Sequence, residues 1–316
     1  MNTLLRYIIF LVIGSSGLTA CNNNSGKPPV TDTGTSGDIK IVVDESFEPI
    51  LDSHVYTFEK TYKYATIRAS YKPEGEAIRD LLNDSVRLAI VPRELTDEEN
   101  KVFKNIKITP RVTKIAIDGV ALIVHPNNPD TLLAIPQLQD IFTGKVKSWK
   151  QINSKSSLSD ITIVFDNNNS STARYILDSI NHKQPLAPNA FAAKSHKALI
   201  DYVANNPNAI GVLGVSWISD FDDPNAMGFL DKINVVSVGL KVNPSKPDTY
   251  YQPFQAYLAQ GTYPLRRNLY IISREARVGL GTGFAAFVAR DKGQRIFLKS
   301  GLVPANAVLR LVTVTE

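Results

Sequence analysis

The chain has 316 residues, of which 43% are hydrophobic and 21% are charged, and its formal net charge is +5. This length allows two domains with hydrophobic cores, and the composition is that of a soluble globular protein. Lys and Arg are scattered without a dense basic stripe or interleaved aromatic residues, which argues against nucleic acid as a partner.

Residues 1–20 have the pattern of an export signal peptide. Arg6 supplies the positive charge, and residues 7–13 form an apolar core that is too short for a comfortable membrane span. Leu18-Thr19-Ala20-Cys21 resembles the lipobox of bacterial lipoproteins, in which the cysteine becomes the lipidated first residue. A chance cysteine beside an ordinary cleavage site is the alternative. Because Cys21 is the only cysteine, it forms no internal disulfide, and its lipidation would anchor the protein to a membrane without spanning it.

The next part of the chain predicts a flexible tether followed by βα units. Residues 21–37 are polar and rich in Gly, Ser and Pro, with almost nothing to bury. Short apolar strands are then expected at residues 39–43, 65–71 and 88–91. Helical spacing of apolar residues follows the first two, at 47–62 and 77–82, and a capped helix start follows the third at 96–99. Three βα units in succession imply a parallel sheet covered by helices.

Residues 106–124 form a long apolar stretch, broken at Asp118-Gly119, that suits strands crossing from one lobe to another. A second α/β region follows, with helices expected at 136–142, 170–180 and 197–205 and strands at 161–165, 209–213 and 233–238. Residues 263–272 would return the chain to the first lobe, before helices at 284–288 and 295–298 and a strand or extended strap at 308–314. The expected fold is therefore α/β and two-lobed, with a mostly parallel sheet flanked by helices in each lobe. Lobe 1 would comprise residues 38–117 and 258–316, and lobe 2 residues 118–257.

Polar turns follow several of the expected strands. The run Asp166-Asn-Asn-Asn169-Ser170-Ser171-Thr172 lies between a strand and a helix, which leaves hydroxyls and backbone N–H groups free to hold an anion. Asp44-Glu45-Ser46 and Pro92-Arg93 end two strands of lobe 1, and Gly75 would let a backbone approach a ligand. Ligands of open parallel sheets bind beyond the carboxyl ends of strands, which predicts a cleft between the lobes. As alternatives, Ser46 and Ser170 could be only helix N-caps, and Arg93 a solvated surface arginine.

Five segments carry a family resemblance. They resemble, in sequence and in order, landmarks of phosphate-binding lipoproteins of the PstS type, which belong to ABC transporters, and the match covers roughly residues 39–304. The segments are DGVALIVHPNNP at residues 118–129, QLQDIFTGKVKSW at 137–149, AIGVL at 209–213, YPLRR at 263–267 and GLVP at 301–304.

The resemblance implies a two-lobed, hinge-closing binding protein of the periplasmic type that holds phosphate or a related oxyanion. In that family, hydroxyls and N–H groups at helix starts, an arginine and an acidic residue hold the anion. Carried over by position, the ligand residues would be Ser46, Phe47, Gly75, Arg93, Asn169, Ser170, Ser171 and Thr172. The resemblance also implies that the protein delivers its ligand to the permease subunits of an ABC transporter. The expected location is the periplasmic or outer-surface side of a bacterial cell envelope. A monomer is expected, with no cofactor and no catalytic activity.

Three departures from the family pattern bear on the ligand. The arginine typical of the strand before the lobe 2 turn appears here as Phe165 or Asp166, and the Ser-Gly-Gly turn of lobe 1 reads Pro73-Glu74-Gly75. Asp44 and Glu45 stand where small neutral residues are usual. A carboxylate beside a phosphate dianion is unfavourable unless it accepts a proton from it, and an arginine contact contributes more than a neutral hydrogen bond.

Two other functions remain open from the sequence. A phosphatase-like hydrolase is one, but His54, His125, His182 and His196 do not stand at metal-ligand spacing, and the chain has neither Gly-x-Ser-x-Gly nor a P-loop. The other is a receptor-derived surface or sensor lipoprotein with an altered ligand. The acidic residues around the expected site motivate this second alternative.

Overall fold

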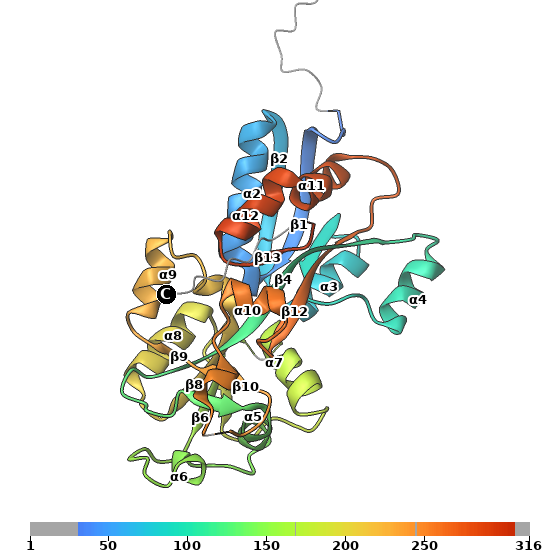
Figure 1. The fold of residues 1–316 in the computed structure, drawn as a ribbon. Helices are drawn as coiled ribbons and strands as arrows, with labels where there is room; N and C mark the ends of the chain where they lie inside the picture. Colours follow the sequence, from blue (N-terminus) through green and yellow to red (C-terminus); the bar gives the residue numbers. More distant parts are fainter. Residues whose placement is uncertain (1–30, 168, 244, 307–316) are drawn as a thin grey trace, which may run out of the picture. The chain divides into compact units, whose positions relative to one another are not determined.

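The computed structural model describes residues 31–167, 169–243 and 245–306, and the described residues from Asp32 to Asn306 belong to one compact unit. The predicted signal peptide, the lipidation at Cys21, most of the tether and the strand at 308–314 lie outside the described residues. The elements are drawn in Figure 1.

The first lobe is built on three parallel strands, β1 (Ser36–Asp44), β2 (Tyr64–Lys72) and β3 (Leu88–Val91). β1 lies between the other two, and Val43 pairs with both Tyr71 and Ile90. A helix follows each strand: α2 (Glu48–Thr61) after the 3-10 turn η1 (Glu45–Phe47), then α3 (Glu74–Leu82) and α4 (Asp97–Asn105). The three predicted βα units are confirmed.

The folded part begins before the predicted end of the tether. Asp32 accepts a hydrogen bond from the Leu280 N–H (2.9 Å) at the start of α11 (Leu280–Ala289) and forms an ion pair with Arg87 (2.6 Å). Thr33 forms a bridge with Ser36. For residues 32–37 the tether prediction is therefore wrong, because polar composition does not reveal that Asp32 has partners far along the chain.

Strand β4 (Arg111–Val124) belongs to both lobes, as Figure 1 shows. It pairs antiparallel with β12 (Arg266–Ser273) and β13 (Val303–Pro304) on the first-lobe side. On the second-lobe side it pairs with β8 (Ala209–Gly214) and β9 (Asn234–Val235). The predicted crossing is confirmed, but the break at Asp118-Gly119 is wrong. The strand continues there because the buried Asp118 side chain is paired with Arg267.

The second lobe repeats the parallel arrangement, with β6 (Thr162–Phe165) between β7 (Ala190–Ala192) and β8. A small separate sheet joins β5 (Leu132–Ala134), β10 (Ser237–Gly239) and β11 (Tyr250–Tyr251). The helices and turns of the second lobe are α5 (Ile135–Phe142), α6 (Trp149–Ile152), α7 (Ser171–Tyr175), the π-helix η2 (Ile176–Ile180), α8 (His196–Asn205), η3 (Val215–Trp217), α9 (Pro224–Leu230) and η4 (Pro247–Thr249).

Each lobe has its own apolar core. One cluster includes Phe142 and Trp149 in the second lobe, and two clusters, around Phe58 and Phe103, lie in the first. Helices α11 and α12 (Asp291–Lys299) cover the first lobe beside α2 (Figure 1). Helix α10 (Gln255–Gln260) belongs with the second lobe, because Leu258 is part of the second-lobe cluster. The chain thus returns to the first lobe at β12, a few residues after the predicted boundary at 258.

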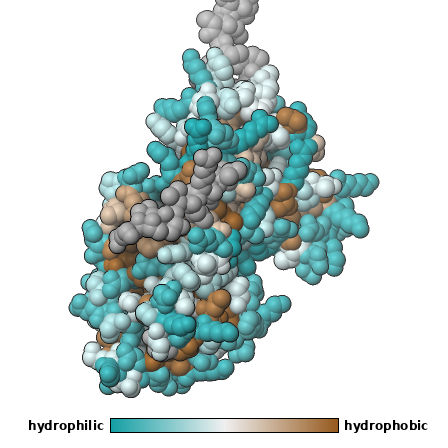
Figure 2. Space-filling model, viewed as in Figure 1, coloured by the Kyte–Doolittle hydropathy of each residue, from teal (hydrophilic) through white to brown (hydrophobic). Residues whose placement is uncertain are grey.

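The face drawn in Figure 2 is mainly hydrophilic, with hydrophobic residues in separate patches. Among the described residues, no helix combines the length and the apolar character that a membrane crossing requires.

Candidate functional site

The turn after β1 and the turn after β6 meet across the two lobes. Ser46 Oγ lies 3.2 Å from Ser171 Oγ, and both residues are fully buried. The Ser216 hydroxyl, on η3 of the second lobe, donates to the carbonyl oxygen of Ser46. The two turns therefore lie together, as expected from their positions at the carboxyl ends of strands. Their contact with a ligand stays a prediction.

Ser46 and Ser170 are used differently by the fold. Asp44 Oδ1 accepts from the Ser46 N–H (2.8 Å) and caps η1, so the Ser46 hydroxyl has no capping role. Ser170 is the N-cap of α7 and accepts from the Ala173 N–H at 3.2 Å. The capping alternative thus holds for Ser170 and fails for Ser46. Thr172, 3.0 Å from the Ser170 hydroxyl, donates to Asp166 Oδ1 at 2.7 Å.

Arg267 of β12 is a buried cation at this meeting point. Its Nε donates to Asp118 Oδ2 (2.8 Å) and its Nη1 to Ser171 Oγ (2.8 Å). The guanidinium also lies over the Phe47 ring, with Cζ 4.9 Å from the ring centroid, which gives Phe47 a role as its platform. Nη2 has no hydrogen-bond partner among the described residues.

Arg267 and Asp118 are not among the predicted site residues, although both lie in segments that carry the family resemblance. A signal was available. Each is a charged residue inside an apolar, strand-like stretch, and charged residues in such places are almost never buried unless they are paired.

Carboxyl groups outnumber the cation where the two turns meet, and Asp118, Asp44 and Glu74 interact with Arg267. Burial raises the pKa of Asp44 to about 6 and also raises that of Asp118, although Arg267 opposes both shifts. The pKa of Glu45 rises to about 8, first because of burial and then because of the charges of Asp166 and Asp44. A hydrogen-bond partner among the described residues is lacking for one oxygen each of Asp44, Glu45, Asp118 and Asp166. A buried unpaired acceptor costs about 1–3 kcal/mol, so a hydrogen-bond donor, including a protonated anion, would be stabilising here.

Arg93 is largely buried and ion-paired, so the alternative of a solvated surface arginine is wrong. Its Nε donates to Glu74 Oε1 (2.8 Å), and its two terminal nitrogens donate to the carboxylate of Glu99 (2.7 and 2.8 Å). Glu74, at the start of α3, also accepts a bidentate pair from Arg174 of α7. Arg93, which was predicted to contact the ligand, is thus paired with two carboxylates of the chain itself.

Gly75 and Asn169 lie at exposed positions. A Cβ added at Gly75 would meet no atom within 4 Å, so packing within the protein does not require glycine there. The Asn169 N–H donates to Asn167 Oδ1 (3.3 Å) within its own turn. Their roles as ligand contacts stay predictions.

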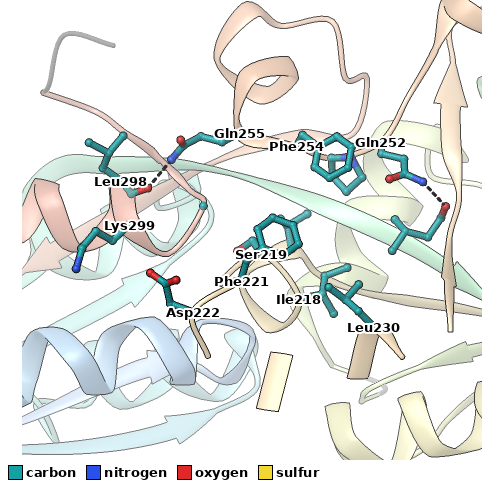
Figure 3. A pocket seen from close by; sticks show the side chains of 14 residues that line it. Ile218, Ser219, Phe221, Asp222, Leu230, Gln252, Phe254, Gln255, Leu298 and Lys299 are labelled. Carbon is teal, nitrogen blue, oxygen red and sulfur yellow. Dashed lines mark hydrogen bonds between the residues drawn. The ribbon is translucent and has the colours of Figure 1, made fainter. Parts of the chain in front are cut away.

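An apolar cavity of about 380 Å³ lies elsewhere, and none of the predicted ligand residues line it. Figure 3 shows Phe221 and Phe254 around it with Ile218 and Leu230. The Gln252 and Gln255 amides at its wall donate to backbone carbonyls of Val235 and Leu298, so they are engaged. The lining is mainly apolar, and its one cation, Lys299, is accompanied by the carboxylate of Asp222.

The four histidines make no metal site in the part of the chain that the structure describes, where no group of three or more His, Cys, Asp or Glu could hold a metal ion. His54 is buried and bonded to the backbone oxygens of Ile50 and Gly293, and His196 is stacked on Trp217.

Solved structures support the two-lobed fold. A phosphate ABC transporter substrate-binding protein from Clostridium perfringens, solved with bound phosphate, matches with a TM-score of 0.70 and 21% identity, covering 85% of this chain and all (100%) of that one. An ABC-type phosphate transport receptor from Vibrio cholerae matches with a TM-score of 0.63 and 22% identity over 84% of this chain and 99% of that one. These matches place the fold among the type II periplasmic binding proteins.

Sequence relatives cover nearly the same length. The phosphate-binding protein PstS of Staphylococcus epidermidis is 25% identical over 292 residues, which are 90% of this chain and 84% of the relative. The corresponding protein of Borreliella burgdorferi is 23% identical over 94% of this chain and 97% of its own. These relatives are binding proteins, in agreement with the expectation that this chain is not an enzyme. A family model described as the PBP superfamily domain matches residues 28–292, and the chain belongs to that family.

Proposed function

We propose that this protein is an extracytoplasmic solute-binding lipoprotein that holds phosphate or a related oxyanion between its lobes and delivers it to an ABC transporter. The observation that carries this proposal is the meeting of Ser46, Ser171 and Arg267, because donors from both lobes converge there on a buried point. The free Nη2 of Arg267 adds a charge-assisted donor that no described residue uses. The phosphate named for the relatives agrees with a cluster of this kind.

A contact between an oxyanion and an acidic residue of this site requires a proton on one of the two partners. Because its pKa is raised to about 8, Glu45 can hold that proton near neutral pH and donate it to an anion oxygen, whereas Asp44, with a pKa of about 6, is mostly ionised there. In the ionised form they can accept a proton from the anion instead. The ligand residues are then the eight predicted positions, from Ser46 to Thr172, together with Arg267. The lipid anchor at Cys21, the permease partners and the cell-envelope location belong to the same proposal.

Isothermal titration with phosphate, sulfate and molybdate tests this function. Ser171→Ala removes a hydroxyl that contacts both Ser46 and Arg267, and we expect it to weaken phosphate binding about tenfold to hundredfold, as the loss of one hydrogen bond to a charged group does. Ser53→Ala is a matched control, since Ser53 is exposed on α2 and bonds only weakly to the Pro49 carbonyl (3.4 Å). A folded protein that shows no binding heat with any of the three anions contradicts the proposal.

A further inference from the structure

Glu74 is bound by arginines from both lobes. Its side chain is almost fully buried at the first position of α3. From α7 of the second lobe, Arg174 donates Nε to Oε1 (2.6 Å) and Nη2 to Oε2 (2.8 Å). From the first lobe, Arg93 donates Nε to Oε1 (2.8 Å). This carboxylate thus has three donated hydrogen bonds and links α3 to α7.

The geometry is the one that arginines use to bind an anion. A bidentate arginine–carboxylate pair is among the strongest charge-assisted contacts in proteins, and it has the fork geometry with which arginine also holds phosphate. Glu74 lies within electrostatic reach of the serine–arginine cluster, because its charge helps to raise the pKa of Asp44. It stands in the first-lobe turn where the resembled family has a serine-glycine sequence.

We propose that the Glu74 carboxylate is a built-in anion: held by Arg93 of its own lobe, it bridges to the second lobe through Arg174, holds the lobes closed without a solute, and competes with an external oxyanion for these arginines. The competition rests on the proposed function, whereas the closure by Glu74 does not. The ligand that competes is an oxyanion small enough to accept the same bidentate contact. Neutralising Glu74 removes the carboxylate charge that both arginines share, while Arg93 keeps its contacts with Glu99 and Arg174 keeps Asp178 (3.3 Å). The loss of that negative charge favours the external anion.

Glu74→Gln is the direct test, because it keeps the size of the side chain and removes its charge. Glu98→Gln is the matched control, because Glu98 also lies in the first turn of a first-lobe helix, α4, but is exposed and forms no ion pair in the described structure. Spin labels on Tyr56→Cys of α2 and Lys155→Cys of the second lobe, in full chains with Cys21→Ser, report the distance between the lobes. Both label positions are exposed.

We expect the ligand-free wild type to give one short distance, Glu74→Gln a longer or broader distribution, and phosphate to restore the short one. We also expect phosphate to bind Glu74→Gln about tenfold more tightly than wild type, on the scale of a hydrogen bond between charged groups. Glu98→Gln should change neither quantity.

The outcomes separate the two proposals. An unchanged ligand-free distance distribution in Glu74→Gln refutes closure by Glu74, and weaker phosphate binding in this variant refutes the competition, although either result leaves phosphate binding itself intact. If Glu74→Gln opens the lobes but neither protein binds phosphate, sulfate or molybdate, Glu74 is confirmed as the closing anion and the proposed function is wrong.

Discussion

Replacing Asp118 by Asn should destabilise the fold strongly. Asp118 and Arg267 are both buried, and their 2.8 Å ion pair lies inside neighbouring strands. Removing one partner of a buried pair costs about 3–5 kcal/mol, because the remaining charge is left without compensation. The fully buried Asp44 carboxyl also interacts with Arg267 and can compensate part of this loss. We therefore expect a decrease in the free energy of unfolding of about 3 kcal/mol, at the lower end of that range.

Urea unfolding followed by circular dichroism measures this loss. With a denaturant slope of about 3 kcal/mol/M, the unfolding midpoint should fall by about 1 M. Asp291→Asn is the control, since its pair with Arg295 is on the surface, with both side chains 73% exposed, and exposed pairs contribute at most about 1 kcal/mol. If Asp118→Asn loses no more stability than Asp291→Asn, the Asp118–Arg267 pair does not stabilise β4 where it crosses between the lobes, and the prediction is wrong.

Two further predictions concern the turns of the first lobe. Because the pKa of Glu45 is raised in the folded protein, the folded state holds its proton more tightly than the unfolded state, so this contribution to stability is present at low pH and is lost as pH rises through about 8. Thermal unfolding should thus show Glu45→Gln gaining stability relative to wild type between pH 6 and pH 9, and a difference that is independent of pH contradicts this. Gly75→Ala should stabilise the fold by up to about 1 kcal/mol, since the added Cβ meets no atom within 4 Å in a helix. If phosphate titration shows unchanged affinity in Gly75→Ala, the predicted backbone contact of Gly75 with the solute is wrong.

The elements of this fold were predictable where local pattern decides them. The strands of the parallel parts are continuous apolar runs between polar turns, as buried parallel strands require, and β4 is too long and too apolar to serve one lobe alone. The meeting of Ser46 and Ser171 followed from their positions at strand ends.

The site chemistry depends on pairings that no local pattern encodes. Arg267 pairs with Asp118, which is 149 residues away in the sequence, and Arg174 pairs with Glu74, which is 100 residues away. Asp32 contacts Leu280 of α11, which is 248 residues away in the sequence, so the polar composition around Asp32 alone predicts a tether there. Each of these charges could be recognised as unusual in the sequence, but its partner is fixed only when the strands and helices have packed.

Because of these pairings, an anion that binds here has to compete with carboxylates of the chain for the arginines. Arg93 and Arg174 each contact a carboxylate of the chain, and Arg267 contacts Asp118, so the described site holds no arginine that is wholly free for a solute. A ligand shifts a conformational equilibrium only by the difference in its affinity for the two states. If Glu74 already closes the lobes, a solute gains little from closure and must gain its affinity from replacing Glu74 at Arg174. The same carboxylate would then set both the resting conformation and the lowest solute concentration to which the protein responds.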